Sequence, residues 1–95
     1  MANQVNAILI HESDNVVTAL ADIGAGEPAI FQKRGAMVEL AAVETIPAFH
    51  KMAVTDIPRM EPIRKYGEVM GQAVTDICKG AHVHDHNIVS PGRRM

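Results

Sequence analysis

Short apolar segments alternate with polar segments along the whole chain, and Gly, Pro and Asp separate them. Runs of this length with such boundaries are typical of strands in a small β-fold. Pro47 and Pro58 stand where a long helix would otherwise have to run. The pattern predicts strands over residues 5–10, 16–20, 37–43, 51–54, 62–66, 73–74 and 81–83.

Two segments are ambiguous. "AMVELAAVET" (36–45) contains residues that favour helix, so a short helix is an alternative to a strand there. "YGEVMG" (66–71) has two glycines and suits either a loop or a bent strand. We therefore predict a mostly β fold in a single domain over residues 1–95, with at most one or two short helices. Its core spans about 7–89, and 90–95 form a flexible tail.

A repeated pattern indicates recurring turns. "ALADIGAGEP", "AVTDIPRMEP" and "AVTDICKGAH" each place Asp-Ile after an Ala-led apolar stretch, and two copies then have a glycine, Gly26 or Gly80. Asp can hydrogen-bond the turn backbone, and Gly adopts positive φ at little cost. Met60 replaces the glycine in the middle copy, which predicts a different geometry for that turn. The uneven spacing of the copies excludes a solenoid.

Composition limits what this chain can do alone. A domain of 95 residues has an expected radius of gyration of about 12 Å and a thin core, too small to enclose a polar metabolite with every group that transforms it. The content of 47% hydrophobic and 21% charged residues argues against disorder. A net charge of −2 without a basic stretch gives no reason to expect nucleic acid as a partner.

Cysteine use and the first residues bear on location. Cys78 is the single cysteine, so no internal disulfide forms, which fits a reducing compartment. The start "MANQVNAILIHESD" has no basic segment, and its apolar run is too short for a signal peptide or a membrane span. We expect a cytoplasmic protein that does not insert into membranes.

Three of the five histidines lie at alternate positions in "HVHDHN" (82–87). In a strand, alternate side chains share one face, so His82, His84 and His86 would project together. Imidazole is the commonest metal ligand, but three histidines along one line rarely bind the same ion. A metal site would therefore use two of them and a third group, His11 or His50. A polar strand end at the surface explains the spacing equally well.

Three other polar clusters offer binding groups. "IHESDNV" (10–16) is typical of a loop whose side chains cap backbone amides. His50 and Lys51 begin a predicted strand, where Lys51 either meets a substrate carboxylate or lies in solvent. Arg64, Lys65 and Tyr66 precede a turn, where they could clamp a carboxylate or sulfonate or protect an edge strand.

Taken together, "IHESDNV", "FHKMAVTDI", "PIRKYGEVMGQA" and "HVHDHN" resemble the SAF domain of the UxaA family. That family contains altronate dehydratases, galactarate dehydratases and sulfolactate sulfo-lyases. The resemblance covers roughly residues 7–89, with the motifs in the family's order. It implies a β-clip fold and, in a chain of this length, the small subunit of a two-part enzyme.

The resemblance also implies a chemistry. It is β-elimination from a 2-hydroxy acid, in which water or sulfite leaves and a 2-keto acid forms. A divalent metal, Fe(II) with Mn(II) as the alternative, would act as Lewis acid. The partner would be a large catalytic subunit that carries the base, and the substrate would be a small anion, either a sugar acid or sulfolactate.

The family's motifs transfer to individual positions of this chain. They imply that His84 and His86 bind the metal, while His82 lies outside the motif. Phe49 departs from the pattern, because a small residue, often Gly, is usual before the His-Lys pair. The residues implied to bind substrate are His11, Asp14, Asn15, His50, Lys51, Lys65, Tyr66 and Asn87.

The sequence therefore predicts the small subunit of a metal-dependent carbon–oxygen or carbon–sulfur lyase that is inactive alone. The alternative is a non-catalytic SAF module for binding or assembly, since the same scaffold serves unrelated functions. In the family that this chain resembles, the galactarate branch lacks the histidine ending, which favours the altronate or sulfolactate branches. The residues do not otherwise identify the substrate.

Overall fold

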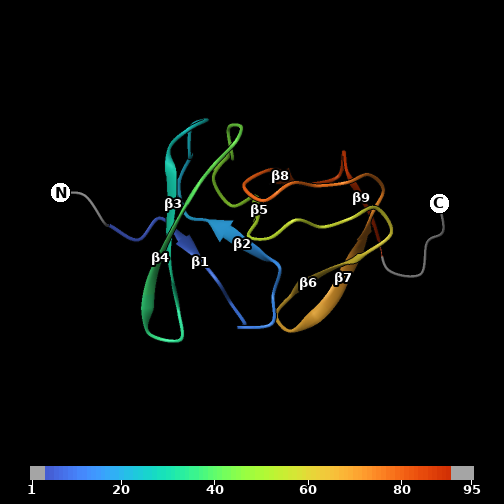
Figure 1. Ribbon diagram of the computed structural model, residues 1–95, viewed down its shortest axis with the longest axis horizontal. Coiled ribbons are helices and arrows are strands. Elements are labelled where there is room, and N and C mark those ends of the chain that lie inside the picture. Colours follow the sequence, from blue (N-terminus) through green and yellow to red (C-terminus); the bar gives the residue numbers. More distant parts are fainter. Residues whose placement is uncertain (1–3, 91–95) are drawn as a thin grey trace.

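The computed structural model describes residues 4–90, which form nine short strands and no helix. Figure 1 shows a central sheet with a two-stranded hairpin on one side and a second, smaller sheet on the other. The central sheet has the order β1-β2-β5-β8, one hairpin is β3-β4, and the other sheet is β6-β7-β9. All pairings are antiparallel. The strands are β1 Ala7–Ile8, β2 Val16–Ala19, β3 Pro28–Lys33, β4 Ala36–Ala41, β5 Lys51–Ala53, β6 Pro62–Lys65, β7 Glu68–Ala73, β8 His82–Val83 and β9 Ile88–Val89.

The central sheet separates two small cores. Val17 and Met52 are cross-strand partners whose side chains pack with β3 residues such as Phe31. Their neighbours in sequence, Val16 and Ala53, are also paired and pack on the other side with residues of β6 and β7. Because successive side chains of a strand point to opposite faces, each short strand contributes to both cores. The radius of gyration is 12.6 Å, close to the predicted value.

The repeated turn pattern occurs four times in the structure, not three, and each copy begins at or directly after the end of a strand. We call 19–26, 42–49, 53–60 and 73–80 the corner segments; each begins with a buried Ala and has a buried Ile four residues later. They pair in twos through the bridges Ile23↔Ile46 and Ile57↔Ile77. The second copy, "AVETIPAF", escaped the sequence analysis because Thr45 replaces Asp.

The aspartates join the paired corner segments. Oδ1 of Asp56 accepts the amide of Lys79 at 2.9 Å, and Oδ1 of Asp76 accepts the amide of Arg59 at 2.8 Å. Asp22 accepts the amide of Ala48 in the other pair at 2.8 Å. Turn amides therefore donate to the aspartates as predicted, but each bond joins two corner segments and does not close a single turn.

The last residue of every corner segment has positive φ. It is +85° at Gly26 and +91° at Gly80, but also +70° at Phe49 and +80° at Met60. The prediction of a different turn at Met60 is therefore wrong. Its amide donates to the carbonyl of Ala73, as the amide of Gly80 does to that of Ala53, so the pairing imposes the same geometry on a less suitable residue.

Asparagine side chains complete two strand edges. Asn6 donates to the carbonyl of Pro28 and accepts the amide of Ile30, at 3.0 and 2.7 Å. Asn15 makes the same pair of contacts with Pro62 and Arg64, at 2.9 and 2.8 Å. Each amide thus supplies one donor and one acceptor, as a neighbouring strand would.

Most predicted strands are present but shorter, and two strands were missed. Residues 36–41 form β4 and residues 68–73 form β7, so the short-helix and loop alternatives are wrong. The sequence analysis missed β3, whose buried Ala29, Ile30 and Phe31 show no alternation, and the two-residue β9. Within residues 4–90 no helix is long and apolar enough to cross a membrane. The last five residues of the predicted tail lie outside the described residues.

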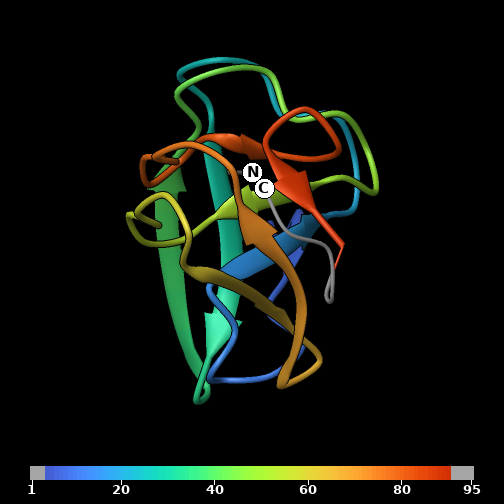
Figure 2. The same cartoon turned by 90° about the vertical axis from the view of Figure 1, so that its right-hand side faces the viewer.

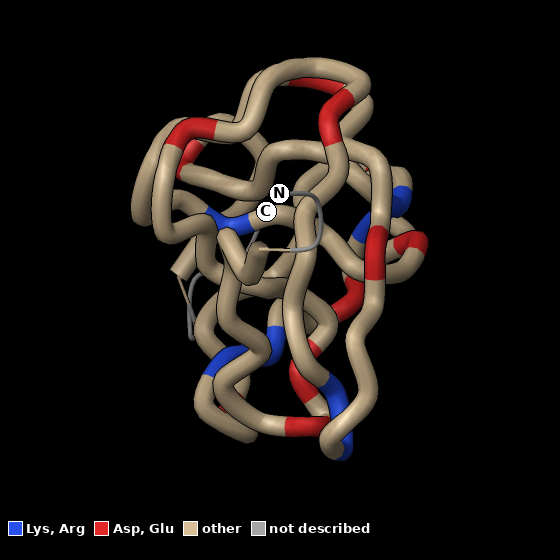
Figure 3. Tube along the Cα trace, turned by 90° about the vertical axis from the view of Figure 1, so that its left-hand side faces the viewer, with Lys and Arg blue, Asp and Glu red and all other residues tan. Residues whose placement is uncertain are grey.

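Charges of both signs are mixed on one face of the molecule. Figure 3 shows Lys, Arg, Asp and Glu distributed over the face that carries the β3-β4 hairpin, without a block of one sign. This distribution gives no support for a nucleic-acid-binding surface on that face.

We predict that Met60→Gly stabilises the fold. The left-handed backbone costs a side-chain-bearing residue about 1 kcal/mol, and Met60 is half exposed, so little packing is lost. Urea unfolding should show a free energy of unfolding raised by up to about 1 kcal/mol. Gly80→Ala is the opposing control, because its Cβ would lie 2.5 Å from the carbonyl oxygen of Ala41. If Met60→Gly were less stable than the wild type, the positive φ of Met60 would not be a source of strain.

Candidate metal centre and anion site

Three histidines form the histidine site at one end of the central sheet. Nδ1 of His50 lies 2.8 Å from Nε2 of His82, and the rings of His50 and His84 stack at 4.0 Å between centroids. One ring nitrogen from each of His50, His82 and His84 lies within 4.8 Å of the others. All three side chains are partly buried.

Backbone pairing brings these residues together. Strand β5 pairs with β8 so that Met52 faces His82, which places the next alternate residues, His50 and His84, on the same side. The strand ends at Val83, and residues 84–87 form a turn closed by a hydrogen bond from the Asn87 amide to the His84 carbonyl. The expected common face of the alternate histidines therefore persists, although the predicted strand does not extend through it.

Asn87 fixes the backbone between two of these histidines. It is buried, its Oδ1 accepts the amide of His84 at 3.0 Å, and its Nδ2 donates to the carbonyl of His82 at 2.8 Å. This is the third instance of the contact that Asn6 and Asn15 make. Both polar atoms of the Asn87 side chain are occupied, which argues against its predicted contact with substrate.

Two further groups surround the histidine site. The ring of His86 lies 5.0 Å from that of His82, and Oε2 of Glu44 accepts the amide of His82 at 3.1 Å. Burial lowers the pKa of His82, and so do His86 and His50, whereas Glu44 opposes the shift. A lowered pKa favours neutral imidazole, the form that binds metal.

The residues of the histidine site fit a divalent metal. Nδ1 of His84 is buried and has no hydrogen-bond partner among the described residues, although buried polar atoms are normally paired. Three imidazoles beside a carboxylate suit Fe(II), Mn(II) or Zn(II), and the Glu44 carboxylate is close by. The predicted ligand pair was His84 and His86. The structure instead groups His84 with His50, one of the two predicted third groups, and with His82, which was set aside.

A separate cationic group lies on the opposite face of β5. We call Lys51, with Lys65 and Thr18 near it, the lysine site. Lys51 is paired with Thr18 and Val83, and both face the second core, away from His50. Burial lowers the pKa of Lys51, Lys65 lowers it further, and Asp85 opposes the shift. Oγ1 of Thr18 is buried without a hydrogen-bond partner in the described part of the chain. Two amines and a free hydroxyl suit an oxyanion.

The polar cluster "IHESDNV" (10–16) lies away from both sites, and its Asp14 binds the backbone. Asp14 is buried and accepts the amides of His11, Tyr66 and Gly67 at 3.1, 3.0 and 2.8 Å. The His11 ring packs against Gly67 so closely that a Cβ there would lie 2.9 Å from it. Figure 2 shows this loop and both hairpin turns at the lower end of the molecule, and the turn at 84–87 at the upper end.

The predicted substrate-binding residues therefore divide into different groups. Asp14 and Asn15, like Asn87, have their polar atoms engaged by backbone, so we assign them to positioning. Tyr66 lies beside Lys65, whose Nζ is 5.1 Å from the ring centroid. Sequence reasoning had no signal for Glu44, because only the pairing of the corner segments brings it to His82. Thr18 was hidden within an apolar strand.

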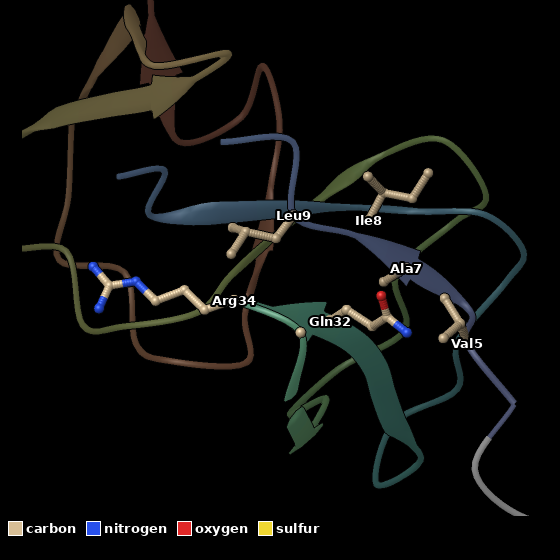
Figure 4. A pocket seen from close by; sticks show the side chains of 7 residues that line it. Val5, Ala7, Ile8, Leu9, Gln32 and Arg34 are labelled. Carbon is tan, nitrogen blue, oxygen red and sulfur yellow. The ribbon is translucent and has the colours of Figure 1, made fainter. Parts of the chain in front are cut away.

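An open groove of about 480 Å³ is unrelated to these groups. Figure 4 shows it between the β1 segment and the β3-β4 turn, with Gln32 and Arg34 on one side and Val5 and Leu9 on the other. Arg34 pairs with Glu12 at 2.6 Å. The groove contains none of the predicted site residues.

We predict that Asn87→Asp disturbs the histidine site more than the rest of the fold. The carboxylate keeps the acceptor for His84 but opposes the carbonyl of His82, which should cost about 1–3 kcal/mol in unfolding free energy. In NMR spectra the ring signals of His82 and His84 should shift. Asn6→Asp makes the same change at another strand edge and should leave those signals in place. If the histidine ring signals were the same in Asn87→Asp and Asn6→Asp, Asn87 would not be the residue that positions His82 and His84.

Comparison with known proteins identifies the family. Residues 5–91 match the family model described as the altronate/galactarate dehydratase SAF domain. Altronate dehydratase of Escherichia coli is 38% identical over 80 residues, and galactarate dehydratase (L-threo-forming) of the same organism is 36% identical over 84 residues. The alignments cover 84% and 88% of this chain, and each covers 15% of the relative.

A third relative is close to this chain in length. The (2R)-sulfolactate sulfo-lyase subunit alpha of Chromohalobacter salexigens is 27% identical over 84 residues, which are 84% of this chain and 89% of that subunit. The chain thus spans about 15% of the two dehydratases and most of the sulfo-lyase subunit. The histidine site, the lysine site and the three asparagine contacts all lie within the matched residues, and the chain belongs to the SAF domain family of altronate and galactarate dehydratases.

Proposed function

We propose that this chain is the small subunit of a metal-dependent lyase that eliminates water or sulfite from a 2-hydroxy acid. Family membership and the names of the relatives, which are dehydratases and a sulfo-lyase subunit, support a lyase. The observation that carries the proposal is the group formed by His50, His82 and His84, together with the unpaired Nδ1 of His84. A large catalytic subunit, which supplies the base, is the proposed partner.

The histidine site would hold the metal. We assign His50, His82 and His84 as ligands of Fe(II), with Mn(II) as the alternative, and Glu44 as a neighbouring carboxylate. A bound divalent ion supplies Lewis acidity to the oxygens of a hydroxy acid. Asn87 keeps two of the three imidazoles at a fixed separation along the backbone. His86 would be an outer neighbour of the site.

The lysine site would bind the acidic group of the substrate. Lys51 and Lys65 provide positive charge for a carboxylate or sulfonate, and Tyr66 lies under the Lys65 ammonium. Lys51 and His50 point to opposite faces of β5, so an acid that contacts both sites has to cross the edge of the sheet at β8. Side chains of Glu44 and Asn87 bond the β8 backbone at this edge, and the large subunit would enclose it.

The first experiment measures metal binding directly. Anaerobic titration calorimetry with Fe(II), and with Mn(II) for comparison, should detect about one ion per chain. We expect His84→Ala and His50→Ala to weaken binding at least about tenfold, because removing one ligand of a small site usually has this effect or a larger one. His86→Ala is the matched control and should change the affinity by less than about threefold. If His86→Ala weakened binding as much as His84→Ala, the originally predicted ligand pair would be favoured.

The lysine site gives a second prediction. Lys51→Met should leave the protein at least as stable as the wild type, since a partly buried cation is replaced by an apolar side chain of similar length. The wild-type penalty is present below the lowered pKa of Lys51 and fades as pH rises toward 10.5, so the stabilities of the two proteins should converge there. The same variant should lose activity in the complex through a higher KM. An unchanged KM would remove Lys51 from substrate binding.

Activity distinguishes the lyase from the alternative binding or assembly module. The tagged chain is purified anaerobically from its own host, and any associated polypeptide is assayed with altronate, galactarate and sulfolactate for a 2-keto acid and for sulfite. Keto-acid formation that depends on this chain supports the lyase and identifies the substrate. A chain that binds its partner but yields no product with any of the three acids would favour the non-catalytic module.

A further inference from the structure

Phe49 is an aromatic residue whose side chain residues 4–90 leave largely uncovered. Its side chain is 74% exposed, more than any other large apolar side chain of residues 4–90. Neither core includes it. An isolated exposed Leu or Val is common on protein surfaces, but an aromatic side chain this open is a frequent mark of a contact with another molecule.

The backbone of Phe49 is also strained. It has φ of +70° at the position where Gly26 and Gly80 end their own corner segments. The contact that the corner requires, from the Phe49 amide to the carbonyl of Ala19 at 2.7 Å, needs no side chain and would form equally with glycine. A costly residue in a conformation that glycine fills easily points to a role outside folding.

The location of Phe49 connects it to the histidine site. It directly precedes His50, and its hydrogen bond to Ala19 places it beside Leu20, which is 40% exposed. Two exposed apolar residues, Phe49 and Leu20, are thus brought near each other by backbone pairing next to the partly buried His50. A polypeptide that closes over His50, His82 and His84 would meet this pair first.

We propose that Phe49, with Leu20 beside it, inserts into an apolar pocket of the large subunit and anchors that subunit over the histidine site. This inference rests on the proposed function. The chain spans about 15% of the dehydratases that it matches, and a similar relative of nearly its own length is named a subunit, so further polypeptide is available to cover the site. Buried aromatic anchors of this kind often dominate the affinity of an interface.

The experiment compares Phe49→Gly with Met60→Gly in the native complex. Both changes relieve a left-handed residue at the end of a corner segment and remove an exposed apolar side chain. The large subunit, assigned by its keto-acid-forming activity, is separated from the tagged wild-type chain and titrated with each purified variant. We expect Phe49→Gly to weaken association at least about 30-fold, which corresponds to about 2 kcal/mol. Met60→Gly should stay within about twofold.

A second readout excludes damage to the fold. The isolated Phe49→Gly chain should unfold at a higher urea concentration than the wild type and bind Mn(II) with unchanged affinity. An active complex in which Phe49→Gly binds as tightly as the wild type would overturn the anchor alone. A wild-type chain that yields no lyase polypeptide would overturn the proposed function and the anchor with it. A homodimer in sedimentation that Phe49→Gly dissociates would assign the residue to a second copy instead.

Discussion

Three asparagine side chains hold the strand edges on which this small fold depends. Each primary amide bonds one carbonyl and the amide two residues further along, so it replaces a strand that the short chain does not contain. Asn6 completes the edge of β3, Asn15 that of β6, and Asn87 that of β8. Without them the exposed backbone groups would rely on solvent or invite another chain. At β8 the same contact sets the spacing of His82 and His84.

The corner segments supply the second constraint. Their paired backbones require positive φ at the same place in all four copies, and two copies satisfy it with glycine. Met60 and Phe49 accept the strain instead. Strain of this kind persists only where the surrounding structure enforces it. Where the side chain of the strained residue does not contribute to folding, the strain indicates a functional role. Both residues meet these conditions, because a backbone bond fixes each of them and neither belongs to a core. Phe49 differs from Met60 in being more exposed, 74% against 50%, and in directly preceding His50.

The family motifs combine two kinds of residue that a sequence does not separate. Asp14, Asn15 and Asn87 bind backbone amides and carbonyls, so any variation there would first change the position of loops. His84 and Lys51 have polar atoms that remain available for a ligand. A motif alone therefore does not distinguish a side chain that positions the backbone from one whose polar atoms are available to a ligand.

The sequence by itself determined the β class, most strand positions, three of the four corner segments and the family. These features depend on local patterns of apolar, turn-forming and polar residues, which can be recognised in the sequence alone. It could not show that His50 lies beside His82 and His84, or that Glu44 bonds His82. Only the tertiary structure decided those relations, because the face of a strand and the pairing of distant turns depend on register between segments.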